Sequence, residues 1–232
     1  ENGIVYHYDG QLVGDYDKCK TENGIIEMLR HTHVTVKAHY DTLIDEDNDP
    51  VRDIQILRDY MDKWDGQLFI DELQLPEDKS VLEIGVGTGR LAVKAAPLCS
   101  SFTGIDISPK TIDRAKQNLA DFPNVSLICD DFMTHTFDGQ FDVIYSSLTF
   151  MHIDDKLMAI NKIAGLLTPG GRFVLSIDKN QDEYIDVGFS KIKVYPDNPN
   201  DICEYLKVIR LKLEKQFETE FAVVFVAKKV QE

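Results

Sequence analysis

The chain has 232 residues, 43% of them hydrophobic and 28% charged, and its 40 acidic and 25 basic residues give a formal charge of −15. This composition is typical of a globular protein, and no window approaches the roughly 18 apolar residues of a transmembrane helix, so a membrane partner is not expected. The acidic balance and the lack of a basic patch disfavour nucleic acid as a partner, because its phosphates would be repelled.

The cysteine pattern bears on the compartment. The four cysteines are far apart and form no Cys-x-x-Cys pair (Cys19, Cys99, Cys129 and Cys203). A disulfide framework or a zinc cluster is therefore disfavoured, and a reducing environment is favoured. Since no secretory signal is evident, we expect a cytoplasmic protein.

The first 75 residues are expected to form an N-terminal arm and a helical cap. Asp9-Gly10 lies between two short apolar stretches and indicates a hairpin, and residues 23–29 are compatible with a short helix. A longer helix is predicted from Pro50 through Trp64, because apolar side chains recur there at steps of three and four residues (Ile54, Leu57 and Met61). Another short helical piece is expected over 68–73.

Two polar clusters in this region raise the question of a metal. His31, His33 and His39 have no acidic or cysteine partner at a spacing that establishes a ligand set, and they are better explained as ordinary surface or core histidines. The acidic run 45–49 resembles a calcium loop, but Pro50 and Ile56 stand where that loop requires glycine and a bidentate glutamate. We therefore predict no metal site.

From Val81 onward the chain alternates between expected strands and helices. Strands are predicted over 81–84, 102–107, 125–129, 141–145 and 172–177, with helices over 90–96, 111–120 and 155–167. That alternation indicates a parallel sheet covered on both faces. The end differs, because a helix over 201–208 precedes two strands, 211–217 and 221–227, which a short turn makes antiparallel.

A glycine turn follows the first of these strands. Gly85, Gly87 and Gly89 would let the backbone turn sharply and let a ligand approach the N-terminus of the next helix. The spacing is G-x-G-x-G, whereas the dinucleotide fingerprint is G-x-G-x-x-G. Glu83, two residues ahead, would be unfavourable beside a pyrophosphate, and it suits a ligand that carries an ammonium group.

Acidic residues close the next two strands. Asp106 ends the second strand, where a carboxylate accepts hydrogen bonds from both hydroxyls of a ribose. Asp130 or Asp131, at the end of the third strand, could accept a hydrogen bond from the exocyclic amine of adenine. These positions together indicate a ligand with an adenosine whose ribose hydroxyls are free.

These motifs, in this order, resemble those of the class I S-adenosylmethionine-dependent methyltransferases. The similar segments are motif I, the acidic second-strand motif, the adenine-contacting motif, motif IV and the turn with the fifth strand (81–89, 104–108, 129–132, 141–147 followed by His152, and 166–173). The nearest-looking members are small-molecule methyltransferases similar to the ubiquinone-pathway type. The resemblance covers about residues 76 to 228 and leaves 1–75 and 179–200 uncovered.

The resemblance implies an α/β fold, a Rossmann-like three-layer sandwich. Its sheet would be seven-stranded and mostly parallel, with an antiparallel C-terminal strand, and a helical N-terminal region would precede it. Residues 1–75 would then be the arm and cap, and residues 76–232 the S-adenosylmethionine-binding domain. The implied cofactor is S-adenosylmethionine, with S-adenosylhomocysteine as its product.

The resemblance also implies roles for individual residues. Glu83 and the backbone of the three glycines would hold the methionine end, and Asp106 the ribose. The remaining expected contacts are Ile107 against the adenine face, the Asp130 side chain at the adenine amine, the backbone of Asp131 and Phe132 at the ring, and Ser146 near the sulfonium. Spacing favours Asp130 over Asp131 for the side-chain role, and Asp131 is also explained as a helix cap or loop residue.

Three further residues have two interpretations each. His152 could take a proton from a hydroxyl or amine acceptor, or it could be a packing or loop histidine. Tyr40 resembles a tyrosine that some relatives place over the cofactor, or it could pack in the core. Arg90 could reach a carboxylate from the start of the helix, or it could be solvated.

The acceptor is expected to be a small molecule. Motif IV here is Ser146-Ser147-Leu148-Thr149, not the Asn/Asp-Pro-Pro-Tyr pattern of enzymes that methylate adenine or amide nitrogens. The acceptor would bind between the sheet edge, the N-terminal helices and residues 179–200, in a monomer or homodimer. A non-catalytic S-adenosylmethionine-binding regulatory or partner protein and a nicotinamide oxidoreductase stay open as alternatives.

Overall fold

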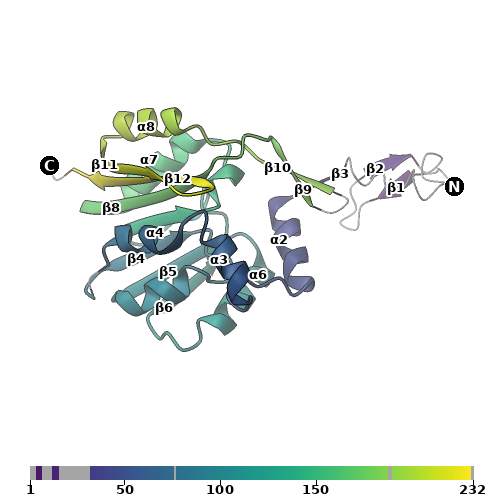
Figure 1. The fold of residues 1–232 in the computed structure, drawn as a ribbon, viewed down its shortest axis with the longest axis horizontal. Coiled ribbons are helices and arrows are strands. Elements are labelled where there is room, and N and C mark those ends of the chain that lie inside the picture. Colours follow the sequence, from purple (N-terminus) through teal and green to yellow (C-terminus); the bar gives the residue numbers. More distant parts are fainter. Residues whose placement is uncertain (1–3, 7–11, 16–31, 76, 188–189, 231–232) are drawn as a thin grey trace.

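The computed structural model describes residues 4–6, 12–15, 32–75, 77–187 and 190–230. A seven-stranded sheet lies between two layers of helices, and a three-stranded sheet lies to one side of it (Figure 1). In the part of the chain that the structure describes, no helix has both the length and the apolarity needed to cross a membrane.

The main sheet has the strand order β11-β12-β8-β7-β4-β5-β6. Its strands are β4 (Ser80–Ile84), β5 (Ser101–Asp106), β6 (Val125–Cys129), β7 (Phe141–Ser147), β8 (Leu167–Asp178), β11 (Leu211–Glu218) and β12 (Ala222–Lys229). Only β12 runs opposite to the other strands of this sheet, so the expected fold class is confirmed. The chain leaves β4 toward β5 and β6 and then returns to β7 on the other side of β4, which is where ligands bind in open α/β sheets.

Successive side chains along the strands pack into two hydrophobic cores, one on each face of the sheet. Val81 packs with residues of α4 (Gly66–Leu73), α5 (Ala92–Ala95) and α6 (Pro109–Asn118) on one face. Leu82, its neighbour, packs with residues of α7 (Lys156–Leu166) and α8 (Pro199–Val208) on the other face. The alternation is the reason that a short apolar run such as 81–84 forms a buried strand here.

Helix starts in this part of the chain follow from their capping residues. The Ser108 hydroxyl accepts a hydrogen bond from the backbone N–H of Thr111, so α6 begins at Pro109, and Asp155 caps α7 in the same way. The helix expected over 90–96 is shorter than predicted. It is α5 alone, continued by a single 3₁₀ turn, η2 (Ala96–Leu98), since Pro97 has no N–H to extend the α-helical ladder.

The N-terminal region departs most from the prediction. The hairpin is confirmed by β1 (Ile4–Tyr6) and β2 (Leu12–Asp15), whereas its turn at Asp9-Gly10, the segment 23–29 and His31 lie outside the described residues. The helix predicted from Pro50 to Trp64 is only α3 (Gln55–Met61), and its apolar residues are not buried. The Asp49 carboxylate accepts a hydrogen bond from the Val51 N–H and holds residues 49–53 in turns instead.

A second small sheet was not predicted. It joins β3 (Thr32–Val34), just before α2 (Val36–Asp45), to β9 (Tyr184–Val187) and β10 (Ser190–Lys193), in the order β3-β10-β9. Strands of three or four residues have too few positions to show a period, and their pairing joins distant segments. The division of the chain at residue 75 stays a prediction, although α4 packs its buried Phe69 and Leu73 into the main sandwich.

Candidate functional site

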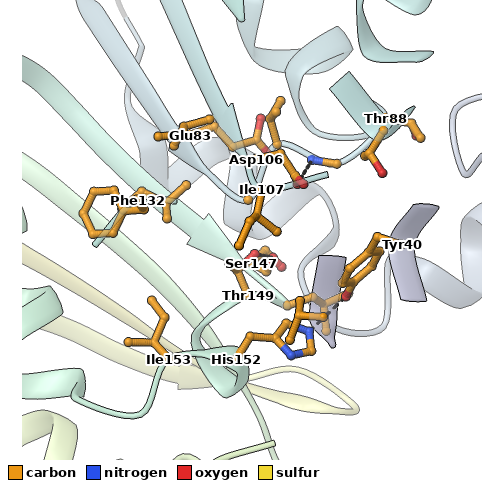
Figure 2. A pocket seen from close by; sticks show the side chains of 18 of the residues that line it. Tyr40, Glu83, Thr88, Asp106, Ile107, Phe132, Ser147, Thr149, His152 and Ile153 are labelled. Carbon is orange, nitrogen blue, oxygen red and sulfur yellow. Dashed lines mark hydrogen bonds between the residues drawn. The ribbon is translucent and has the colours of Figure 1, made fainter. Parts of the chain in front are cut away.

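A cavity of about 700 Å³ opens at the carboxyl ends of β4, β5, β6 and β7. The glycine turn and the strand ends form one wall, while α2 and the segment 147–155 form another (Figure 2). Its volume is in the range of ligand sites, roughly 300–1,000 Å³.

The glycine turn gives the cavity its backbone wall. Gly85, Gly87 and Gly89 have φ of +76°, +56° and +99°, a region that residues with a side chain rarely adopt. A Cβ on Gly85 would collide with the Thr149 side chain, whereas a Cβ on Gly87 would stand in open space. The turn therefore lies against Thr149 at Gly85, and at Gly87 its backbone is exposed to a ligand.

Glu83 places a buried carboxyl group at the cavity wall. Its Oε2 accepts a hydrogen bond of 2.8 Å from the Tyr145 hydroxyl, and the two residues are paired on neighbouring strands. Burial raises the pKa of Glu83 to about 8, although Tyr145 and Arg90 oppose the shift. A cationic ligand group beside this carboxyl would favour its ionised form.

Asp106 lies on the same side of the cavity. Its Oδ2 accepts a hydrogen bond of 3.0 Å from the Gly87 N–H, and its Oδ1 accepts one of 3.0 Å from the Ser108 N–H (Figure 2). Burial raises the pKa of Asp106, and these backbone N–H groups counteract part of the rise. The neighbouring Ile107 lines the cavity with its side chain 38% exposed.

The segment after β6 closes the cavity beyond Ile107. Both aspartates there line the cavity, but each carboxylate also has a local partner. Asp130 is 2.8 Å from His135 Nδ1, a contact that lowers the pKa of Asp130, and Asp131 accepts a hydrogen bond from the Met133 N–H. Phe132 is buried and lines the same wall. The preference for Asp130 over Asp131 stays a prediction.

The structure does not bring Ser146 into the cavity. Its hydroxyl is fully buried and donates to the carbonyl of Ile84, the residue that it pairs with on β4. Ser147 lines the cavity instead, because consecutive side chains of a strand point to opposite faces. The expectation that Ser146 lies near a sulfonium stays a prediction, and Ser146 does not line the cavity.

Arg90 lines the cavity but is not solvated. Its guanidinium forms a bidentate ion pair with the carboxylate of Asp65 and lies 3.6 Å from Asp62. These carboxylates raise the pKa of Arg90 against the effect of burial. Asp65, which no sequence pattern singled out, also accepts a hydrogen bond from Ser147.

Opposite the glycine turn, two segments 112 residues apart meet. The Tyr40 hydroxyl of α2 is 3.0 Å from His152 Nε2, and the two rings meet edge to face (Figure 2). His152 ends η3 (Phe150–His152), and burial lowers its pKa to about 4, so the imidazole is neutral at pH 7. Burial also raises the pKa of Tyr40. His152 Nδ1 is buried and has no hydrogen-bond partner among the described residues.

Comparison with known proteins finds a family match within the chain. Residues 82–175 match the model of a methyltransferase domain. In this segment and in its fold, the chain is similar to the class I S-adenosylmethionine-dependent methyltransferases.

Known relatives match only part of this chain. It is 34% identical over 104 residues to malonyl-[acyl-carrier protein] O-methyltransferase 1 of Ilyobacter polytropus (44% of this chain, 39% of that one). It is 30% identical over 145 residues to ubiquinone biosynthesis O-methyltransferase of Coxiella burnetii (61% and 62%). The chain thus spans less than two thirds of each relative.

Solved structures share the fold of this chain. The N-methyltransferase NodS from Bradyrhizobium japonicum WM9, determined with S-adenosylhomocysteine, superimposes with a TM-score of 0.61. The match has 20% identity and covers 82% of this chain and 98% of NodS. Identity at this level speaks for the fold alone.

The residues that line the cavity fit S-adenosylmethionine. Gly87 leaves open space where a Cβ would stand, so a ligand can lie against the backbone. The buried carboxyl of Glu83 suits an ammonium group, and Asp106 suits ribose hydroxyls, with Ile107 and Phe132 beyond it for an apolar ring. The residues that sequence reasoning missed are Asp65, Ser147, Thr149 and Tyr195, and none of them lies in a pattern that distinguishes it from a loop or cap residue.

Proposed function

We propose that this protein transfers the methyl group of S-adenosylmethionine to a small-molecule acceptor. The observation that carries the proposal is the single cavity, which joins the strand ends of β4 and β5 to the Tyr40–His152 pair. One end has the acids that suit an amino acid and a ribose. The other end, beyond the glycine turn, has space for a second molecule.

Residues along the strand ends would hold the cofactor. Glu83 would bind its ammonium group, Asp106 its ribose hydroxyls, and Ile107 would pack on its base. The backbone of Gly85 and Gly87 would contact the methionine end, with Asp130, Asp131 and Phe132 around the adenine. Gly89 does not line the cavity and lies against Leu119 instead. When bound, S-adenosylmethionine supplies a methyl group that its sulfonium already activates. The protein contributes mainly by holding the two reactants in line.

Apolar and aromatic side chains would hold the acceptor. Ile153 and Tyr195 line the cavity beside the Tyr40–His152 pair. The Tyr195 N–H donates to the Met151 carbonyl at 2.8 Å, which fixes the segment after β10 against the segment after β7. The acceptor would therefore enter between α2 and residues 148–155 and present its nucleophile toward the glycine turn.

His152 is the candidate base, with Tyr40 as the residue that orients its ring. A neutral imidazole can take a proton as the acceptor loses it. The names of two relatives describe O-methyltransferases, which supports an oxygen acceptor. We also propose a cytoplasmic monomer or homodimer that does not bind nucleic acid.

Two experiments test the proposal. In a thermal-shift assay, S-adenosylhomocysteine should stabilise the protein and NAD should not; a ligand at about a hundred times its Kd adds roughly 2.7 kcal/mol. Stabilisation by NAD alone would overturn the proposal and favour an oxidoreductase. In a second assay, labelled S-adenosylmethionine is incubated with a metabolite extract. Binding without any labelled product would instead favour a non-catalytic S-adenosylmethionine-binding protein.

A further inference from the structure

Asp65 is a buried carboxylate that lies behind the cavity wall. Only 2% of the residue is exposed, and it precedes α4, outside the segment that matches the methyltransferase domain. It does not line the cavity, yet each of its two polar side-chain partners, Arg90 and Ser147, does. Asp65 therefore touches the site only through those two residues.

The geometry around Asp65 is that of a clamp. Both of its oxygens accept from the Arg90 guanidinium, Oδ2 also accepts from the Ser147 hydroxyl at 2.8 Å, and Oδ1 accepts from the Gly66 N–H at 2.6 Å. A bidentate pair fixes a guanidinium in position and plane, which a single contact does not. Asp65 thus links the turn after β4 to the end of β7.

The neighbouring backbone holds Asp65 in place. The Trp64 carbonyl accepts a hydrogen bond of 2.8 Å from the Ser176 hydroxyl of β8, and the Lys63 carbonyl accepts one of 3.0 Å from the Phe221 N–H. The Trp64 ring nitrogen also donates to Asp178 at 3.0 Å. The segment 63–65 is therefore attached to the end of β8, which is the neighbour of β7 in the sheet, and to the start of β12.

Arg90 and Glu83 lie on the same part of the wall. Arg90 stabilises the ionised form of Glu83 and Asp65 opposes it, so the three charges act on one another. Tyr145 holds Glu83 from one side, and Asp65 holds Arg90 from the other. The cavity wall thus carries the acidic Glu83 and the cationic Arg90, and each is hydrogen-bonded to a buried residue behind it.

We propose that Asp65 is a positioning residue of the donor site, which holds Arg90 so that the guanidinium receives the carboxylate of the donor's amino-acid end while Glu83 receives the ammonium group. This assignment rests on the proposed function. The guanidinium has five N–H donors, so the pair with Asp65 leaves donors for a ligand carboxylate. A purely structural helix cap would stabilise α4 and would not discriminate between ligands.

The test compares two ligands that differ only in the amino-acid end. S-adenosylhomocysteine carries it, and 5′-methylthioadenosine lacks it. In Asp65→Asn, the affinity for S-adenosylhomocysteine should fall about 10- to 100-fold, because Arg90 loses its charged partner, while the affinity for 5′-methylthioadenosine stays within about twofold. Isothermal titration calorimetry of the full chain measures both affinities.

Asp71→Asn is the matched control, since Asp71 is an exposed aspartate of the same helix whose side chain contacts Gln67. Both affinities should be unchanged in it. Equal losses for the two ligands in Asp65→Asn, or no loss for either, would overturn the assignment. If Asp65→Asn does not fold, Arg90→Lys tests the assignment instead, because lysine keeps the positive charge but cannot form the bidentate pair with Asp65. Arg90→Lys must weaken S-adenosylhomocysteine selectively, and an equal effect on both ligands overturns the assignment.

Failure of this assignment and failure of the proposed function give different results. If the wild-type protein binds neither ligand, the proposed function fails and the assignment fails with it. If the wild-type protein binds both ligands and the variants lose them equally, only the role of Asp65 fails.

Discussion

The two ends of the cavity are built in different ways. The end at the glycine turn consists of residues that lie one after another at the carboxyl ends of adjacent parallel strands, such as Glu83 and Asp106. The end at Tyr40 and His152 joins α2 to a turn after β7, and Tyr195 reaches it from the segment after β10. One end follows from local sequence order, and the other follows from long-range pairing.

This difference separates two kinds of function. Parallel strands place their ends at one edge of the sheet whatever the loops do, so a ligand common to a family can be held there. The small sheet β3-β10-β9 brings together segments that the family match does not include. Such segments can vary without disturbing the strand ends, so we expect them to determine which acceptor binds.

The largest expected effect is at the strand ends. Asp106→Ala removes a carboxylate that accepts from Gly87 and Ser108 and, in the proposed function, from the ribose. Hydrogen bonds to a charged group contribute ~1.5–3 kcal/mol each, so the loss of two lowers donor affinity about 100-fold or more. Calorimetric titration with S-adenosylhomocysteine measures this affinity. Asp113→Ala, an exposed aspartate of α6, should leave it unchanged, and wild-type affinity in Asp106→Ala would contradict the ribose assignment.

The second prediction concerns the other end. His152→Ala should lower kcat about 100-fold, which is the usual contribution of a general base, and leave the affinity for S-adenosylhomocysteine within about twofold. The two readouts separate the ends of the cavity. If donor affinity fell as much as kcat, His152 would be a packing residue of the donor site and the functional division of the cavity would be wrong.

Sequence reasoning succeeded where structure is local. The run Val81-Leu82-Glu83-Ile84 and the glycines after it predicted β4, its turn and its ligand-facing side, because each depends on the residues themselves and their immediate neighbours. The resemblance pointed to Ser146, whereas Ser147 is the serine of β7 that lines the cavity, because the sequence alone did not resolve which face of β7 each residue occupies. The small sheet and the Asp65 clamp were missed because their partners lie far away in the sequence.

The third prediction compares two glycines within one turn. Gly85→Ala should destabilise the fold by about 1–3 kcal/mol, because its Cβ would collide with Thr149 and its φ is +76°. Gly87→Ala has no such collision and is strained only by its positive φ of +56°, so it should destabilise the fold less. Its new methyl group stands in open space at the cavity wall and should weaken donor binding instead. Urea unfolding and calorimetry together measure the contrast, and equal stabilities would contradict the collision.

The smallest expected effect is a pH dependence that Glu83 contributes to folding. Burial raises the pKa of Glu83 from 4.5 to about 8 in the folded chain, so between those values the folded state binds more protons than the unfolded one. The free energy of unfolding therefore falls as pH rises through that window, and the contribution is fully present only below about pH 4.5. Each pKa unit corresponds to about 1.4 kcal/mol, but the cavity admits water, so we expect a loss of ~1–2 kcal/mol.

Glu83→Gln isolates this contribution, because glutamine keeps the shape and an acceptor for Tyr145 but does not titrate. Urea unfolding at pH 5 and pH 8 should show the wild-type protein losing stability relative to Glu83→Gln. A ligand ammonium group beside Glu83 would lower its pKa again. Saturating S-adenosylhomocysteine should therefore diminish the loss of stability relative to Glu83→Gln, whereas 5′-methylthioadenosine, which lacks the ammonium group, should not. A difference that both ligands diminish equally would mean that Glu83 does not face the amino-acid end, and the donor end of the cavity would have to be reassigned.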